Sequence, residues 1–246
     1  MDDYGAETYG DRIAEVYDDV VAEMGLDTEG TVAFLAERAG GGPVLELAIG
    51  TGRIAIPLRA RGLEIHGIDA SEAMVAKLRG KPGGAGIPVT FGDFADVGVE
   101  DRYTLVFVVF NTLWALLTQE EQVRCVRGVA EHLTEDGLFV VEAFVPDPGR
   151  FDRGQRVNVR SIATRRVSLE ASMHDPVTQR VSAQQISLEE GGGIRMYPVE
   201  IRYVWPSELD LMARLAGMRL RERWGGWHGE PFTGDGRHVS VYELEP

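Results

Sequence analysis

Regular alternation of short apolar segments with helical segments is the feature of this sequence that most restricts its fold. Runs that are apolar throughout are typical of parallel strands buried on both faces, and the segments between them carry apolar residues at helical spacing. We therefore expect a doubly wound α/β sheet covered by helices on both sides. The five apolar runs are residues 44–48, 63–69, 89–91, 105–110 and 138–144.

The rhythm changes before and after this region. Residues 11–24 and 28–39 have the spacing of two helices, and the long stretch after Phe144 has four strand-like runs separated by turn sequences. A helix at 207–216, opened by Ser207 as N-cap, and two strands follow. We predict N-terminal helices at 1–40, an α/β domain at 41–146 and 206–246, and a small antiparallel β cap inserted after the fifth strand at 147–205.

Charge and cysteine content exclude several classes of function. The 246 residues carry a formal net charge of −14 at pH 7. Nucleic acid and membrane surfaces are therefore unfavourable partners, because such binding depends on clusters of Lys and Arg. Cys125 is the single cysteine, so no disulfide can form within the chain. The first residues contain no basic region or apolar run, and we expect a cytoplasmic protein.

A glycine-rich turn directly follows the first predicted strand. Gly50 and Gly52 lack side chains, so a ligand can approach the backbone closely there. Together with Ala55 the turn also satisfies the spacing of the dinucleotide fingerprint. The turn alone therefore does not choose between a nicotinamide dinucleotide and another nucleoside cofactor.

Acidic residues near the ends of three successive strands narrow this choice. Glu46 lies inside the first strand, where a carboxylate requires a cationic or hydrogen-bond-donating partner. Asp69 ends the second strand, where an acid can bind ribose hydroxyls, although it could also belong to a helix N-cap region. Asp93 and Phe94 follow the third strand, where Asp93 could equally form a turn. An acid beside the turn suits S-adenosylmethionine (SAM), which has an ammonium, a sulfonium and no phosphate.

This pattern resembles the successive cofactor motifs of class I SAM-dependent methyltransferases. The resemblance spans roughly residues 9–145 and resumes at 206–244, where the last strand is antiparallel in that family. It implies a Rossmann-like, mostly parallel sheet, with SAM as cofactor and S-adenosylhomocysteine (SAH) as product. Ala48 stands where the family more often has glycine, and alanine should still fit. The residues that carry the resemblance are Glu46, Ala48, Gly50, Gly52, Asp69 and Asp93.

The resemblance also implies roles for individual residues. The strand and turn residues would border the methionine part of SAM, Asp69 the ribose and Met74 the adenine face, whereas Arg53 would bind the cofactor carboxylate or lie on the helix surface. The tyrosines near the N-terminus resemble a lid helix that closes on SAM. The predicted cofactor-binding residues are Tyr17, Glu46, Ala48, Gly50, Gly52, Arg53, Asp69, Ala70, Met74, Asp93, Phe94 and Phe110.

The acceptor side is predicted from topology. If the strand at 218–224 is parallel to its neighbours, the loop 225–236 lies over the pocket and brings His228 near the reacting atoms. His228 is the candidate general base, with a solvated loop residue as the alternative, and His66, His132 and His174 are expected to be structural or remote. The predicted acceptor-binding residues are Tyr9, Asn111, Trp114, Trp227 and His238.

These features predict transfer of a methyl group from SAM to an oxygen or nitrogen of a small-molecule acceptor in secondary metabolism. Two alternatives remain at this point: an NAD(P)-dependent oxidoreductase using the same turn, and a SAM-binding protein without transfer activity. No cluster of His, Cys, Asp and Glu has metal-ligand spacing, so we predict no metal. A homodimer through the inserted sheet is expected because exposed edge strands invite pairing.

Overall fold

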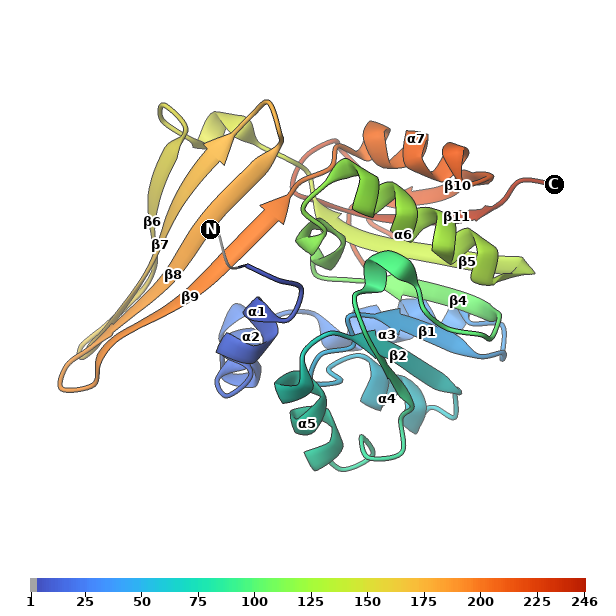
Figure 1. Ribbon diagram of the computed structural model, residues 1–246, viewed down its shortest axis with the longest axis horizontal. Helices are drawn as coiled ribbons and strands as arrows, with labels where there is room; N and C mark the ends of the chain where they lie inside the picture. The colour runs from blue at the N-terminus through green and yellow to red at the C-terminus, as the bar shows by residue number, and fades with distance from the viewer. Residues whose placement is uncertain (1–3) are drawn as a thin grey trace.

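A seven-stranded sheet forms the centre of the computed structural model, which describes residues 4–246 (Figure 1). Residues 1–3 of the predicted N-terminal region lie outside the described residues. The strand order is β10-β11-β5-β4-β1-β2-β3. These strands are β1 (Val44–Leu47), β2 (Ile65–Asp69), β3 (Val89–Phe91), β4 (Tyr103–Val108), β5 (Leu133–Phe144), β10 (Met218–Trp224) and β11 (Arg237–Leu244).

The pairing directions confirm the predicted fold class. β1 pairs in parallel with both β2 and β4, and β4 pairs in parallel with β5. β11 is antiparallel to β5 and to β10, so β10 has the same direction as β5. The carboxyl ends of β1, β2, β4, β5 and β10 therefore meet at one edge of the sheet, where doubly wound folds bind ligands.

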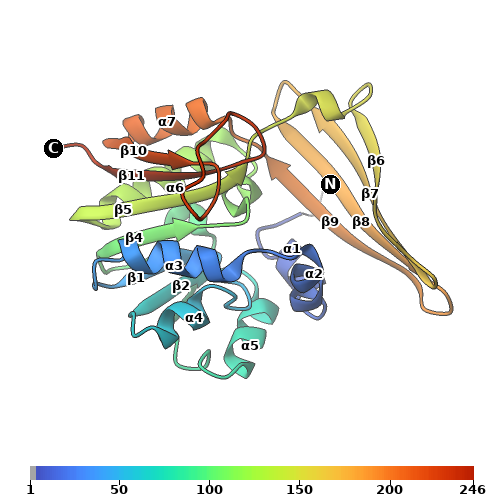
Figure 2. The same ribbon diagram turned by 180° about the vertical axis from the view of Figure 1, so that it is seen from behind.

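Helices cover both faces of this sheet. α6 (Gln119–His132) and α7 (Pro206–Leu215) lie on one face, and α3 (Thr28–Arg38) and α4 (Ala55–Ala60) lie on the other (Figures 1 and 2). α7 begins one residue earlier than expected, with Trp205 rather than Ser207 as N-cap. Pro206 occupies the first turn, where proline's missing N–H leaves no hydrogen bond unmade.

Residues 8–24 form two helices where the spacing predicted a single helix at 11–24. α1 (Thr8–Ile13) and α2 (Tyr17–Met24) are separated by a turn, and we call this pair the lid helices. α1 lies close to α5 (Glu72–Gly80), because Gly10 packs on Ser71: a Cβ added at Gly10 would lie 2.5 Å from the Ser71 Cβ. The Ser71 hydroxyl also donates to the Asp11 carboxylate at 2.6 Å. The lid helices are therefore seated directly over the end of β2.

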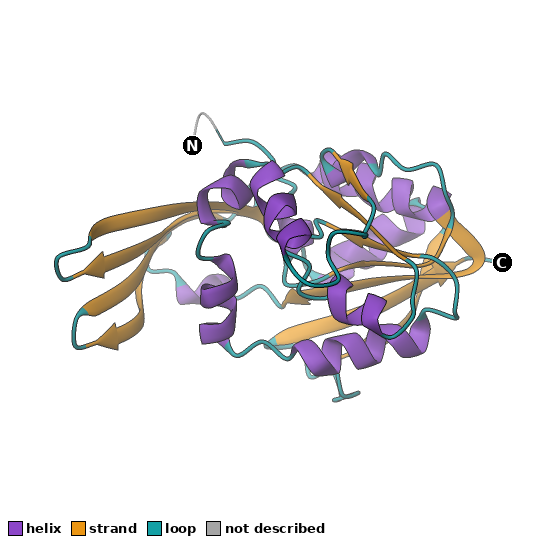
Figure 3. Ribbon diagram, turned by 90° about the horizontal axis from the view of Figure 1, so that it is seen from below, coloured by secondary structure: helices purple, strands orange, loops and turns teal. Residues whose placement is uncertain are grey.

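The inserted segment forms a separate four-stranded antiparallel sheet, the cap, that projects beyond one end of the α/β domain (Figure 3). The Arg202 side chain, at its last strand, contacts Gln122 of α6 and Glu208 of α7 and so fixes the cap to the helices. Among residues 4–246 no helix is both long and apolar enough to cross a membrane. The cap strands are β6 (Gln155–Ala163), β7 (Arg166–Asp175), β8 (Arg180–Glu189) and β9 (Gly193–Arg202).

Candidate active site

The turn after β1 is built from left-handed backbone conformations. Ala48, Gly50 and Gly52 have φ values of 54°, 56° and 79°. A Cβ at Gly52 would lie 2.3 Å from Leu78 Cδ1, whereas at Gly50 the nearest heavy atom would be 3.9 Å away. Gly52 thus permits close packing of α5, and Gly50 leaves its surroundings open for a ligand. Ala48 adopts its conformation at a cost of about 1 kcal/mol.

Asp69, at the end of β2, holds this turn in place. Its carboxylate accepts hydrogen bonds from the Gly50 N–H at 2.7 Å and from the Ser71 N–H at 2.8 Å. Burial raises the pKa of Asp69, and the two backbone hydrogen bonds oppose that effect. The side chain therefore fixes the geometry of both adjacent turns and lies at the edge of the sheet where a ribose would bind.

Glu46 is buried inside β1 with an unmatched oxygen. Among the described residues its Oε2 atom has no hydrogen-bond partner. Burial raises the pKa of Glu46 to about 8, although the charge of Arg53 and the Ala55 backbone N–H oppose the shift. A buried acceptor without a donor is unfavourable, so this oxygen is suited to a ligand that donates a hydrogen bond or carries a positive charge.

Arg53 and Tyr17 enclose Glu46 from the side of the lid helices. The Arg53 guanidinium donates to the Thr28 hydroxyl at 3.2 Å and lies 6.0 Å from the centre of the Phe110 ring. Tyr17 is half-buried near Arg53 and Glu46, and removal of its hydroxyl from water raises the pKa of that group. Four predicted cofactor residues from α2, β1, the following turn and the end of β4 thus come together.

Polar contacts attach α2 to the glycine turn. The Asp18 carboxylate accepts from the Thr51 hydroxyl at 2.7 Å and from Lys81 Nζ at 2.8 Å, and Lys81 also donates to the Thr51 carbonyl. Burial would raise the pKa of Asp18, but the hydrogen bonds from Lys81 and Thr51 outweigh it and lower the pKa. The sequence patterns did not identify Thr51 and Lys81, since the contact joins segments far apart in the chain.

The residues predicted for the adenine side divide between surface and core. Asp93 caps the short 3-10 helix η1 (Phe94–Asp96) by accepting a hydrogen bond from the Ala95 N–H at 2.9 Å. Its side chain is half-buried beside β3. Phe94 is packed in the main core. Met74 is buried beneath α1 together with Ile13, and Ala70 is half-buried at the end of β2. The turn-forming role weighed for Asp93 is therefore present in the structure.

A cavity of about 430 Å³ opens where the lid helices, the end of β4 and the cap meet. The predicted acceptor residues Tyr9 and Asn111 line it, together with Tyr17 and Phe110 from the cofactor set. Ion pairs on its cap wall join Arg160 to Glu170 and Arg180 to Glu200. Its lining comes from α1, α2, the end of β4, η2 (Thr112–Ala115), the segment after β5, and β6 to β9.

Three predicted acceptor residues do not line this cavity, which corrects their assignment. Trp114 is 1% exposed, because η2 turns its indole into the core against Phe144, with ring centres 3.9 Å apart. Trp227 packs on Phe34 of α3 at 5.3 Å. His238 is buried on β11, where its Nδ1 lies 2.9 Å from the Ser240 hydroxyl and burial lowers its pKa to about 4.

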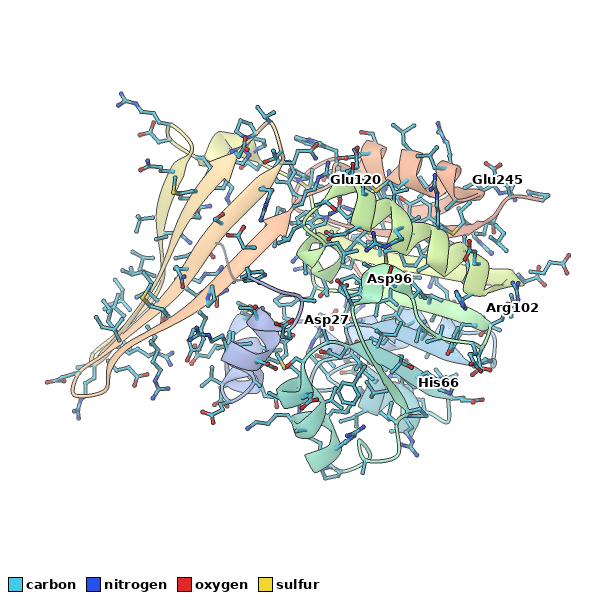
Figure 4. All side chains as sticks on the ribbon, viewed as in Figure 1. Asp27, His66, Asp96, Arg102, Glu120 and Glu245 are labelled. Atoms are coloured by element: carbon cyan, nitrogen blue, oxygen red, sulfur yellow. The ribbon has the colours of Figure 1, made fainter. Side chains whose placement is uncertain are left out.

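The predicted base His228 is also located away from the cavity. The His228 Nε2 atom lies 2.8 Å from the carboxylate of Asp27, which is the N-cap of α3 (Figure 4). The His228 side chain is largely exposed. His66 pairs with the Tyr103 hydroxyl on the far side of the α/β domain from the cap (Figure 4). In the described part of the chain, no group of three His, Cys, Asp or Glu side chains could hold a metal ion.

Glu142 of β5 is a site residue that the sequence patterns missed. It is buried at the carboxyl edge of the sheet, accepts a hydrogen bond from the Phe110 N–H at 2.6 Å and lies 3.5 Å from the Arg237 guanidinium. An acid within an apolar strand was the signal that identified Glu46. The same signal was present at Glu142 and could have identified it.

Comparison with known proteins identifies the family. Residues 44–137 match the family described as "Methyltransferase domain". The CcbJ methyltransferase from Streptomyces caelestis is 43% identical, with a TM-score of 0.92 and coverage of 99% of this chain and 100% of that one. The cypemycin N-terminal methyltransferase of Streptomyces sp is 27% identical over 95% of this chain and 96% of its own length. The sugar N-methyltransferase KedS8 from Streptoalloteichus sp shares the fold at 22% identity, with a TM-score of 0.69 and coverage of 100% of this chain and 99% of that one. The chain therefore belongs to the class I SAM-dependent methyltransferases, as its cofactor motifs predicted.

Proposed function

We propose that this protein transfers the methyl group of SAM to an amine nitrogen of a small acceptor held in the cavity beneath the cap. The enclosed cavity between the lid helices, the end of β4 and the cap is the observation that carries this proposal, because it adjoins the cofactor turn through Tyr17 and Phe110. Among the similar proteins, one is named a sugar N-methyltransferase and another an N-terminal methyltransferase of cypemycin. The family assignment replaces the oxidoreductase alternative.

The residues around the glycine turn suit SAM. The unmatched Glu46 oxygen fits the α-ammonium group, and Arg53 beside it fits the carboxylate. The open space at Gly50 allows close approach to the backbone, and Asp69 is placed for ribose hydroxyls. When bound, SAM supplies an electrophilic methyl group on its sulfonium.

The tyrosines of the cavity lining suit a nitrogen acceptor better than an oxygen acceptor. Burial raises the pKa of Tyr4, Tyr9 and Tyr17, so their hydroxyls stay protonated near neutral pH. The carboxylate of Glu170 is engaged by Arg160. A neutral amine brings its own lone pair, whereas a hydroxyl needs a base to remove its proton. The tyrosines can therefore orient an amine and exclude water without accepting a proton.

The test is methyl transfer from SAM labelled with carbon-13 in the methyl group. Primary and secondary amines, each with a matched alcohol, are offered to the protein, and NMR distinguishes N-methyl from O-methyl products. We expect product only from amines. Product from the alcohols would overturn the choice of nitrogen, and SAM binding without any product would favour the SAM-binding protein that lacks transfer activity.

Other expectations stay proposals. We infer a role in secondary metabolism from the similar proteins named for cypemycin and for a sugar, and a cytoplasmic location and a homodimer remain predictions. Consistent with a dimer, one face of the cap carries exposed apolar side chains. Sedimentation analysis of wild type and Val157→Lys tests it, with a monomeric variant expected. These exposed side chains are Val157, Val159, Ile162, Met173, Ile194 and Met196.

A further inference from the structure

Two consecutive non-glycine residues just after β4 have left-handed backbone conformations, which are unfavourable for Phe110 in particular. Phe110 and Asn111 have φ values of 59° and 63°, in the left-handed region that favours glycine. Such conformations persist only where the surroundings enforce them, and they concentrate at functional sites. We call this pair the β4 turn.

Contacts with β5 enforce the β4 turn. The Glu142 carboxylate accepts from the Phe110 N–H at 2.6 Å, and the Glu142 carbonyl accepts from the Asn111 N–H at 3.1 Å. The Asn111 side chain in return accepts from the Phe144 N–H at 2.6 Å. The first of these contacts is the one made by a side chain of β5, so a substitution of Glu142 can remove it without altering the strand backbone.

The β4 turn forms part of the wall between two cavities. Phe110, Asn111 and Phe144 line both the cavity beneath the cap and a second cavity of about 550 Å³ beneath the loop at 225–236. Glu142 lines the second cavity, as does Arg237, which lies 3.5 Å from its carboxylate. The position of this wall therefore depends on the buried Glu142 carboxylate, which is itself held by Arg237 of β11.

We propose that Glu142 is a positioning residue for methyl transfer. Its carboxylate holds the β4 turn in the left-handed conformation, and the turn places the Phe110 ring and the Asn111 side chain at the junction of the cofactor site and the acceptor cavity. The role in transfer rests on the proposed function. The effect of Glu142 on the conformation of the β4 turn can be measured without any acceptor.

The experiment compares Glu142→Ala, Glu142→Gln and a matched control, Glu243→Ala. Glu243, on β11, pairs with Arg219 of β10 at 2.8 Å and lines neither cavity. Hydrogen exchange reports on the amides of Phe110 and Asn111, steady-state kinetics with the best amine give kcat and KM, and calorimetry gives SAH affinity. Thermal melting verifies that each variant is folded.

In Glu142→Ala we expect exchange at the β4 turn to rise about tenfold and kcat to fall about tenfold or more, since small misplacement of reacting groups is costly. SAH affinity should stay within about threefold, or about 0.7 kcal/mol. Glu142→Gln keeps an oxygen that can accept from Phe110, so it should restore both protection and kcat. Glu243→Ala should change neither.

Unchanged hydrogen exchange at Phe110 and Asn111 in Glu142→Ala would show that Glu142 does not hold the β4 turn in its conformation. Raised exchange with a wild-type kcat would overturn the role in transfer, as would a Glu142→Gln variant that is protected yet as inactive as the alanine variant. A wild-type protein that methylates nothing would overturn the proposed function and the role in transfer together, and the exchange data would still decide whether Glu142 holds the turn.

Discussion

The cofactor side and the cap side of this site are built in opposite ways. Around the cofactor turn, most of the site residues come from one short segment: Glu46, Ala48, Gly50 and Arg53 all lie in β1 or in the turn after it. The cap wall instead combines residues from four strands and the segment after β5. Local chain geometry fixes the first arrangement, whereas strand register fixes the second.

This difference suggests that the two sides can be altered independently. The cofactor side depends on buried polar groups with demanding geometry, such as the two hydrogen bonds to Asp69. The cap side depends on the shape of a cavity whose lining mixes tyrosines, ion pairs and small residues. Loss of a buried hydrogen-bond acceptor should therefore disable cofactor binding, and a change in side-chain volume should disable acceptor binding.

Replacing Asp69 with Ala should have the largest effect. The Gly50 and Ser71 N–H groups would lose their acceptor, so we expect SAH affinity to fall by about 100-fold or more and unfolding free energy by about 2–3 kcal/mol. Calorimetric titration and urea unfolding measure the two quantities. Asp96→Ala is the control, because Asp96 is an exposed side chain paired with Arg124 away from the glycine turn, and an equal loss of SAH affinity there would contradict the role given to Asp69.

Replacing Ala183 with Phe should separate the two sides. Ala183 lines the cavity from β8, so a bulky ring there should lower kcat/KM for the acceptor by about 30-fold while leaving SAH affinity within about twofold. Ile186→Phe is the control, since Ile186 lies on the opposite face of the same strand and does not line the cavity. Parallel loss of SAH binding in Ala183→Phe would show that the sides are coupled.

The pH dependence of SAH binding tests the unmatched carboxylate of Glu46. Its pKa is raised from 4.5 to about 8 by burial, and a bound ammonium would favour the ionised form. SAH affinity should therefore rise about tenfold per pH unit below pH 8 and level off above it. Glu46→Gln should flatten this profile, and a profile that stays steep in the variant would assign the titration to another group.

The raised pKa of Glu46 also determines how the stability of the ligand-free protein changes with pH. Between pH 4.5 and about 8 the folded state retains the Glu46 proton that the unfolded state has released, so the free energy of unfolding should fall as pH rises through this window. Urea unfolding at pH 5 and pH 8 measures the change. Glu46→Gln should lose this part of the pH dependence.

Replacing His228 with Ala should have the smallest effect. His228 is largely exposed and paired with Asp27, away from the cavity, so we expect less than about a twofold change in kcat and at most about 1 kcal/mol in unfolding free energy. Kinetics with the best amine and thermal melting measure these quantities. A large loss of kcat would restore the sequence-based assignment of His228 as base.

Prediction from sequence succeeded for the local structure that contiguous residues form. The strands, the glycine turn and the acids at the ends of β1 and β2 were identified because strand and turn patterns are local. Trp114, Trp227 and His238 do not line the cavity as predicted, because their side chains are buried in the core even though their segments lie where the topology placed them. Side-chain direction depends on packing at a turn, which no local pattern encodes.

The sequence by itself determined the fold class, the cofactor turn and the family, because hydrophobic periodicity and glycine positions act over a few residues. Only the tertiary structure decided which residues enclose the acceptor, that His228 pairs with Asp27, and that Glu142 holds the β4 turn. Each of these joins residues far apart in the chain. The packing of the strands and helices brings these residues into contact, so the contacts can be identified only from the folded structure.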